Sequence, residues 1–254
     1  MLLNNEFPAT GEYPAPIRSS SGNMPGSGGN VPGWQVTLVD ACGFGREGLR
    51  AALYQHFLSS GHVEVTVAAT LALSGLAILR GEKASSVKPR CLVLRLPFSS
   101  REALHLLLQL GTLPAGYYER VVILSAVAPD KVRRMLISTG LTGQICLADD
   151  HLALSALCRV IAPERRDVAG DVSCHCEVLL SQPHRQFTPA EWRVLSQTLQ
   201  GVSAREQARQ AGTRIKTIYT QRACGLHKLK VRDIRMLLRQ FWPVRNRMSK
   251  ECPE

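Results

Sequence analysis

Residues 187–231 read FTPAEWRVLSQTLQGVSAREQARQAGTRIKTIYTQRACGLHKLKV, and this stretch decides the fold of the C-terminal quarter of the chain. It opens with Thr188-Pro189-Ala190-Glu191, a capping box with proline at the first helical position. The box predicts a helix through about Leu199, which Gly201 ends. After Phe187 the sequence therefore changes to an all-helical pattern.

The next signals predict two short helices joined by a turn. Ser203-Ala204-Arg205-Glu206 is a second capping box, and it predicts a helix to Ala211. The turn Gly212-Thr213-Arg214 then leads into a third helix over about residues 215–229, and a fourth helix is expected over 233–242. Two short helices around a glycine-containing turn are typical of a helix-turn-helix, whose second helix enters the major groove of DNA.

The third helix is amphipathic in a way that suits DNA. Ile218, Leu226 and Leu229 fall on one face and are expected in the core. The rest of the helix and its flanks carry hydroxyl, amide and cationic groups, which hydrogen-bond to phosphates and base edges. The candidate DNA-binding residues are Arg214, Lys216, Thr217, Tyr219, Thr220, Gln221, Arg222, Ala223, Lys228 and Lys230. A surface helix with ordinary polar residues is the alternative interpretation.

The net charge of the chain is concentrated in this region. The formal charge is +11, and residues 187–250 hold 14 Lys and Arg against three acids, whereas the remainder holds 17 basic and 17 acidic residues. A basic domain on an otherwise neutral protein is the electrostatic pattern of a polyanion binder. A solvated basic face without a partner is the alternative.

The stretch also carries a family resemblance. The residues Phe187 to Glu191, Val194-Leu195, Gly201, Ser203, Glu206, Ala208, Lys216-Thr217-Ile218, Lys228-Leu229 and Val231 resemble the LuxR/FixJ-type four-helix DNA-binding domain, with a spacing closest to the Rcs-type capsule regulators. The resemblance implies that the third helix reads the major groove and that the fourth forms a dimer seam. The apolar stripe Ile234, Leu237, Leu238 and Phe241 is the candidate seam, with packing into the domain's own core as the alternative.

Three positions depart from this family. Gln207 and Gly225 stand where the family usually buries an aliphatic side chain, and Lys230 replaces a usual glycine after the third helix. Glycine inside a helix costs about 1 kcal/mol relative to alanine. We expect these departures to affect the stability of the domain more than DNA binding.

The N-terminal part alternates short apolar runs with amphipathic stretches. The runs are 36–39, 63–68, 91–94, 121–124 and 144–147, and helices are expected over about 47–57, from residue 68 to about 80, 100–110, 129–138 and 149–161. Apolar runs that alternate with helices predict a five-stranded parallel sheet with helices on both faces. The predicted fold is thus an α/β domain over 34–161 followed by a small all-α domain over 187–242.

The α/β domain resembles a response-regulator receiver, but it lacks the residues of phosphoryl transfer. The resemblance implies an acid pair after the first strand, a phosphoacceptor Asp after the third, a hydroxyl after the fourth and a lysine after the fifth. Asp40 and Ser125 match, whereas Ala41 follows Asp40 and Arg95 takes the phosphoacceptor position. No lysine occurs between Lys131 and Lys216. We therefore expect a degenerate receiver with no phosphoacceptor.

The remaining segments are interpreted from composition. Residues 1–33 are rich in Gly, Pro, Ser and Asn and predict a disordered leader; residues 162–186 predict an interdomain linker, and 243–254 a basic tail. The eight cysteines are expected as free thiols, because the chain is large and shows no export signal. Cys174-His175-Cys176 has no second ligand pair for zinc, so no metal site and no cofactor are expected. No membrane-spanning segment or signal peptide is apparent, which predicts a cytoplasmic, nucleoid-associated protein.

These features predict a sequence-specific DNA-binding transcription regulator that does not depend on phosphorylation. The expected partners are double-stranded DNA and a second regulator chain, in a homodimer or a heterodimer. No nucleophile, base and acid recur at a recognisable spacing, so no enzymatic activity is expected. Two alternatives remain: an interaction module that modulates a related regulator with little DNA contact of its own, and a ligand or redox sensor coupled to DNA binding.

Overall fold

The computed structural model describes residues 33–57, 63–71, 88–114, 116–161 and 174–242. The expected leader at 1–33 lies almost wholly outside these residues, as do the end of the helix expected near Arg80 and the basic tail at 243–254. The described residues belong to one compact unit.

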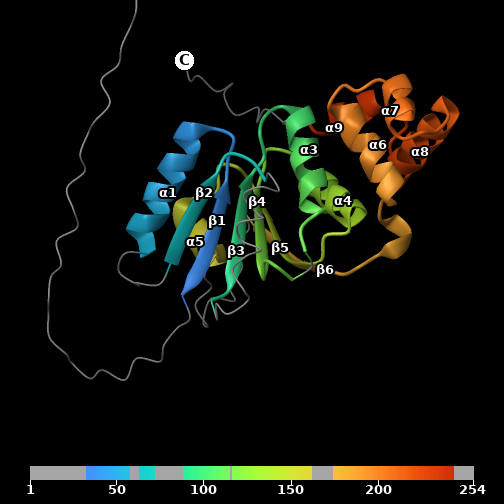
Figure 1. The fold of residues 1–254 in the computed structure, drawn as a ribbon. Helices are drawn as coiled ribbons and strands as arrows, with labels where there is room; N and C mark the ends of the chain where they lie inside the picture. Colours follow the sequence, from blue (N-terminus) through green and yellow to red (C-terminus); the bar gives the residue numbers. More distant parts are fainter. Residues whose placement is uncertain (1–32, 58–62, 72–87, 115, 162–173, 243–254) are drawn as a thin grey trace, which may run out of the picture. The chain divides into compact units, whose positions relative to one another are not determined.

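A six-stranded sheet forms the centre of the α/β domain (Figure 1). Its strands are β1 (Trp34–Val39), β2 (Val63–Ala68), β3 (Arg90–Arg95), β4 (Arg120–Leu124), β5 (Gly143–Ala148) and β6 (Cys174–Leu179). The spatial order is β2-β1-β3-β4-β5-β6, and the first five strands are parallel to one another. The five predicted parallel strands are therefore confirmed, but the prediction was wrong in number, because β6 adds a sixth strand antiparallel to β5.

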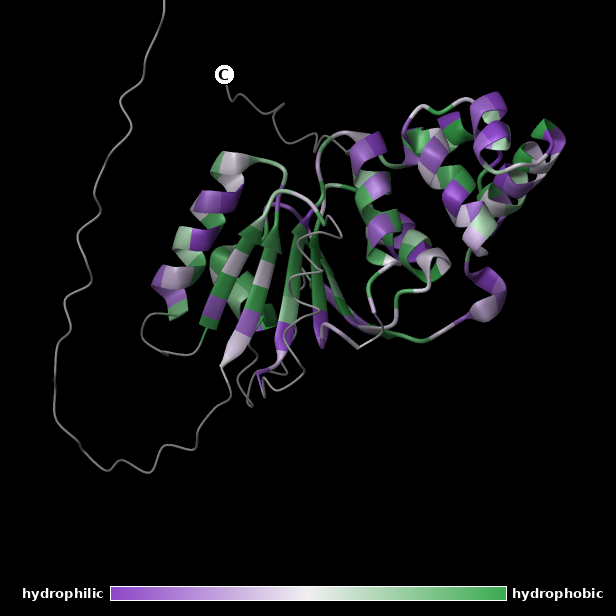
Figure 2. Ribbon diagram, viewed as in Figure 1, coloured by the Kyte–Doolittle hydropathy of each residue, from purple (hydrophilic) through white to green (hydrophobic). Residues whose placement is uncertain are grey.

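Helices cover both faces of this sheet, as predicted. On one face α1 (Gly43–Phe57) and α5 (Leu154–Ile161) contribute Leu53, Leu157 and Ile161 to a cluster with the side chains of β1, β3 and β4. On the other face lie α3 (Ser100–Leu110) and α4 (Pro129–Thr139), whose leucines pack on the opposite side chains of the same strands. The central strands are hydrophobic along most of their length because both faces are covered (Figure 2).

The helix α5 begins five residues later than predicted. Asp149 Oδ1 accepts a hydrogen bond from the backbone N–H of His151 at 2.9 Å, and the backbone carbonyl of Asp149 accepts one from Leu152 at 3.1 Å. This local turn of the Asx type competes with helix formation, so the chain becomes helical only at Leu154.

Beyond β6 and a short 3-10 turn η1 (Pro183–Arg185), the chain is helical. Its helices are α6 (Pro189–Leu199), α7 (Ala204–Gln210), α8 (Ile215–Lys228) and α9 (Ile234–Gln240). The predicted capping box of α6 is complete: Thr188 Oγ1 accepts from Glu191 N–H, and the Glu191 carboxylate accepts from Thr188 N–H at 2.8 Å. The box predicted for α7 is only half formed, because Ser203 accepts from Glu206 N–H while the Glu206 carboxylate bonds elsewhere.

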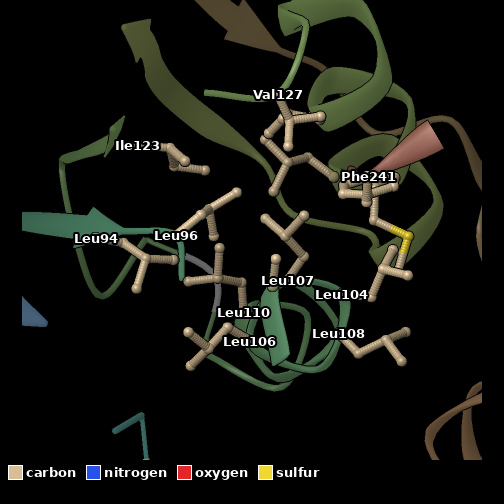
Figure 3. Close-up of a cluster of buried hydrophobic side chains, with 14 of the residues drawn as sticks. Leu94, Leu96, Leu104, Leu106, Leu107, Leu108, Leu110, Ile123, Val127 and Phe241 are labelled. Carbon is tan, nitrogen blue, oxygen red and sulfur yellow. The ribbon is translucent and has the colours of Figure 1, made fainter. Parts of the chain in front are cut away.

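The helices α3 and α4 share one buried cluster with α6, α8 and α9. Figure 3 places Phe241, which follows α9, in the same cluster as Leu104 and Leu107 of α3. The indole Nε1–H of Trp192 in α6 also donates to the Leu108 carbonyl of α3 at 3.0 Å. Within the described residues, every helix is too short or too polar to cross a lipid bilayer.

Candidate nucleic-acid interface

The helices α7 and α8 are joined by a tight turn that fixes where α8 begins. Gly212 adopts φ +61°, a conformation that glycine tolerates without the penalty of a Cβ, and the Thr213 N–H bonds to the Ala208 carbonyl at 3.0 Å. The inner face of α8 is anchored by Ile218, which is fully buried against Val194 of α6 and Ala208 of α7. Burial of Ile218 therefore sets which side of α8 faces outward.

The outward face of α8 is polar and accessible. The predicted contact residues Lys216, Tyr219, Thr220 and Ala223 are exposed, as is Arg214 before the helix. They recur at intervals of three and four residues, so they lie along one side of the helix. The residues Thr217, Gln221 and Arg222 are half-buried at the flanks of this face.

One flanking cation is held in place by an aromatic ring. The Arg222 guanidinium carbon lies 4.8 Å from the centroid of the Tyr219 ring, a cation–π geometry. Both side chains also line a hollow of about 700 Å³ between α8 and the start of α9. Among the described residues, Arg232 and Arg235 complete its basic lining and Asp233 is the one acid. This part of the surface therefore offers several guanidinium groups to a phosphate backbone.

The two predicted lysines near the end of α8 differ in environment. The Lys228 ammonium lies 2.6 Å from the Glu191 carboxylate and 2.8 Å from the Gln186 carbonyl, so it ties α8 to the start of α6. Lys230 is exposed and adopts φ +56°. Three exposed residues on α8 were not among the predicted contacts: Ile215, Cys224 and His227.

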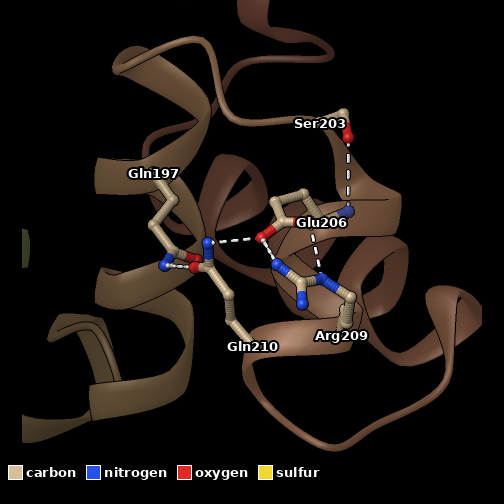
Figure 4. Close-up of polar contacts among 5 residues, drawn as sticks. All are labelled: Gln197, Ser203, Glu206, Arg209 and Gln210. Carbon is tan, nitrogen blue, oxygen red and sulfur yellow. Dashed lines mark hydrogen bonds and ion pairs between the residues drawn. The ribbon is translucent and has the colours of Figure 1, made fainter.

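A polar network holds α7 against α6 (Figure 4). The Glu206 carboxylate accepts hydrogen bonds from Arg209 at 2.6 and 2.8 Å and from Gln210 at 2.8 Å, and Gln210 in turn accepts one from Gln197 of α6. The hydrogen bonds from Arg209 and Gln210 lower the pKa of Glu206 to about 2. The carboxylate of Glu206 is thus committed to side chains and does not complete the capping box.

The departures at positions 207 and 225 are accommodated by specific packing. Gln207 is buried, and its amide N–H groups donate to Thr198 Oγ1 at 3.1 Å and to the Val202 carbonyl at 2.9 Å, whereas its Oε1 accepts nothing from the described residues. At Gly225 a Cβ would lie 2.8 Å from Leu195 Cδ1. The glycine thus lets α8 approach α6 more closely than any larger residue would allow.

The side chains of the stripe predicted as a dimer seam pack mainly against other residues of the same chain. Leu237 and Phe241 are buried in the cluster shared with α3, and Ile234 and Leu238 pack against it. Arg235 and Arg239 are exposed beside the stripe, four residues apart. Met236 and Trp242 are the hydrophobic side chains that this segment leaves exposed among the described residues.

The carboxyl edge of the sheet carries the guanidinium of Arg95, at the position where the resemblance to a receiver implies a phosphoacceptor. Asp40 follows β1 and is 4% exposed; its Oδ1 accepts from Cys42 N–H at 2.8 Å and its Oδ2 lies 3.8 Å from Arg95 Nη1. Arg95 at the end of β3 also donates to the Asp150 carbonyl at 3.4 Å. Its positive charge therefore lies beside Asp40, where the resemblance to a receiver implies a metal ion.

Two neighbouring groups complete this edge. Burial, together with a hydrogen bond with Asp149, raises the pKa of Asp150 after β5. Ser125 after β4 is buried, and its Oγ accepts from Val127 N–H at 2.9 Å, which is a structural role. The side chains of Asp40 and Ser125 thus both accept hydrogen bonds from backbone N–H groups of this chain.

The cysteines depart from the expectation of free thiols. Cys146 and Cys176 form a disulfide, although they are 30 residues apart. The pairing was missed because 162–186 was interpreted as a linker, whereas β6 within it brings Cys176 directly opposite Cys146.

No protein-family model and no curated protein matches this sequence. Several solved structures are similar. The two-component response regulator RcsB in complex with DNA shares 18% identity over 82% of this chain and 98% of that chain, with a TM-score of 0.43. RcsB from Salmonella enterica serovar Typhimurium bound to promoter rprA shares 18% identity over 81% of this chain and 97% of that chain, with a TM-score of 0.37. FixJ from B. japonicum shares 16% identity over 83% of this chain and 96% of that chain, with a TM-score of 0.33. These neighbours are response regulators. The TM-scores lie below 0.5, so we base the function proposed below on the residues of this chain.

Proposed function

We propose that this protein is a sequence-specific DNA-binding transcription regulator, in which α7 and α8 form a helix-turn-helix and α8 enters the major groove. The observation that carries the proposal is the exposed face of α8, with Lys216, Tyr219, Thr220 and Ala223 along one side. Ile218 anchors the opposite side in the core. A helix presented in this way offers hydrogen-bonding groups at the spacing of base edges and phosphates.

The surrounding charge supports the same function. The basic excess of the chain lies in the segment that contains α8, and Arg222, Arg232 and Arg235 surround the hollow beside it. These cations supply the sequence-independent part of DNA affinity by releasing counterions. A regulator of this kind would act on the nucleoid in the cytoplasm.

We further propose that phosphorylation does not control this regulator. A guanidinium cannot form the acyl phosphate that a carboxylate forms with acetyl phosphate, and Arg95 places a fixed positive charge beside Asp40. Incubation with acetyl phosphate and Mg²⁺ should leave the intact mass unchanged. A phosphoryl adduct within 34–161 would show that another carboxylate has taken the role.

Control through a partner chain is the remaining mode that we propose. DNA half-sites one helical turn apart require two recognition helices, and the exposed pair Arg235 and Arg239 repels an identical pair on a second copy. A related regulator with acids at these positions would relieve that repulsion. The interaction-module alternative is separated from this one by gel shifts with and without such a partner.

The test uses substitutions on the proposed reading face. Lys216→Ala and Arg222→Ala should each weaken binding to a DNA fragment selected from genomic DNA, and each should reduce the slope of log affinity against log salt by about one unit. Fluorescence anisotropy over a salt series measures both quantities. Circular dichroism verifies that the fold is intact.

Arg101→Ala is the matched control, because Arg101 is exposed on α3 and its loss removes the same charge away from α8. Its affinity should stay close to that of the unsubstituted protein. If both α8 variants bind DNA as tightly as this control, α8 is not the reading helix.

A further inference from the structure

Three cysteine sulfurs converge where β5 meets β6. The Sγ atoms of Cys146, Cys174 and Cys176 all lie within 4.8 Å of one another. The strand register explains the convergence, because Cys146 is paired with Cys176 and Ala148 with Cys174 across the two strands. Cys174 and Cys176 are two residues apart, so both lie on the face of β6 that carries the partner of Cys146.

The three sulfurs have different bonding and different access to solvent. Cys146 is buried on β5 and is bonded to Cys176, which is exposed on β6. Cys174 is half-buried and lies outside the disulfide, with its Sγ 3.5 Å from the Cys176 Sγ. A thiol therefore touches one sulfur of a disulfide that solvent also reaches.

A guanidinium lies within electrostatic reach of this cluster. Arg120 on β4 is held by hydrogen bonds to the Gln144 side chain and to the Val160 carbonyl. Burial lowers the pKa of Arg120, while the charges of Cys91, Glu119 and Cys174 raise it, which places Cys174 within electrostatic reach of the guanidinium. A nearby guanidinium stabilises a thiolate, which is the reactive form of cysteine.

The other buried cysteines of this domain are in a different state. Burial raises the pKa of Cys91 to about 12 and that of Cys158 to about 11. These two thiols stay protonated and unreactive at neutral pH. Cys91 and Cys158 are therefore not expected to take part in exchange, in contrast to the cluster on β5 and β6.

We propose that Cys146, Cys174 and Cys176 form a thiol–disulfide exchange site that opens and closes the covalent link between β5 and β6. The Cys174 thiolate attacks the Cys176 Sγ; a Cys174–Cys176 bond forms as the Cys146–Cys176 bond breaks. The electron pair of the broken bond goes to the Cys146 sulfur, which takes up a proton in place of the one that Cys174 released. No electrons are gained or lost in this step.

A low-molecular-weight disulfide supplies the oxidising equivalents that form the first bond. It accepts two electrons and two protons from the Cys146 and Cys176 thiols and is itself converted into two thiols. The exchange then turns a link between two strands into a link within β6 alone. The site thus determines whether β6, the edge strand that leads into η1 and α6, is covalently bonded to β5.

The experiment maps the position of the thiol in the oxidised full-length protein. The protein is equilibrated with glutathione disulfide and quenched in acid, which protonates thiolates and stops exchange. It is then denatured, its thiols are alkylated without reduction, and its peptides are identified by mass spectrometry. The expected result is a thiol label shared between Cys174 and Cys146, and loss of the Cys146 label in Cys174→Ser.

The control variant is Cys42→Ser, which removes an exposed cysteine outside the cluster and should leave the Cys146 label unchanged. Circular dichroism verifies that Cys174→Ser is folded. The proposal is overturned if the oxidised protein carries its cluster thiol at Cys174 alone. It is also overturned if Cys146 and Cys176 both remain thiols in glutathione disulfide. Neither outcome bears on DNA binding, which the variants of α8 test separately.

Discussion

At the scale of single residues, the side chain of Arg95 offsets the charge of a buried carboxylate. Its guanidinium lies 3.8 Å from the Asp40 carboxylate, which is 4% exposed, while Arg95 itself is about one-third exposed. A buried carboxylate that loses its ion-pair partner is costly, although solvent around Arg95 reduces the effect. Near this carboxylate the chain also needs a glycine, because a Cβ at Gly45 would lie 2.6 Å from Asp40 Oδ2.

Arg95→Ala should therefore lower the free energy of unfolding by about 1–2 kcal/mol. Adding Asp40→Asn should recover part of the loss, since it removes the uncompensated charge. Urea denaturation of the two variants measures the difference. Equal stability of the single and the double variant would show that Arg95 does not compensate Asp40.

The backbone conformation of Lys230 also lowers the stability of the fold. It adopts φ +56°, a backbone conformation that costs a residue with a Cβ about 1–2 kcal/mol. Lys230→Gly should raise the free energy of unfolding by about 1 kcal/mol, which urea denaturation would show as a higher midpoint. If Lys230 also contacts phosphate, the same variant should bind DNA more weakly and with a flatter salt dependence. Lys230→Ala, which keeps the Cβ, should show the loss of binding without the gain in stability.

At the scale of elements, the hydrogen bonds of Glu206 make the stability of α7 dependent on pH. The pKa of Glu206 is lowered from its usual value to about 2, chiefly by the hydrogen bond from Arg209. Its stabilising contribution is complete above the ordinary pKa of a glutamate, about 4.3, and is lost as the pH falls through 2. Arg209→Ala should return the pKa of Glu206 toward its ordinary value, as carboxyl resonances followed by NMR would show. Arg205→Ala removes a neighbouring exposed charge and should leave the titration unchanged.

The same scale shows why some elements were predictable from sequence and others were not. The bounds of α3 and α6 were predicted to the residue, because Ser99 and Thr188 are caps whose side chains accept the hydrogen bonds that start each helix. The strand β6 was missed. Its letters CHCEVL alternate between apolar and polar over residues 174–178, but the segment around them was interpreted as a linker. The burial of the strand does not follow this alternation, since Cys176 and Val178 are exposed, and the strand is ordered by backbone pairing with β5.

The candidate interface was predictable to a similar degree. The outward side of α8 followed from the positions of Ile218 and Leu226, which are buried as expected. The ion pair between Lys228 and Glu191 could not be predicted from sequence spacing, because the two residues are 37 positions apart in the chain. The pairing of Cys146 with Cys176 was hidden for the same reason, because it depends on β6.

At the scale of the whole molecule, assembly is governed by what α9 already contacts. Leu237 and Phe241 are buried with α3, so a seam built on this stripe would compete with packing inside the chain. We expect sedimentation at micromolar concentration to give a monomer or a weak dimer that strengthens with salt, because salt screens Arg235 and Arg239. A tight homodimer that is independent of salt would remove the reason to propose a partner.

The close contact at Gly225 has a consequence for how this sequence can vary. A Cβ at 225 would lie 2.8 Å from the Cδ1 methyl of Leu195, so the usual gain from replacing a helical glycine by alanine is offset by the displacement of this buried side chain. Alanine at 225 therefore requires a different rotamer of Leu195 or a smaller side chain at 195. Positions 195 and 225 are therefore expected to covary: in homologous sequences, a larger residue at 225 should be accompanied by a smaller side chain at 195.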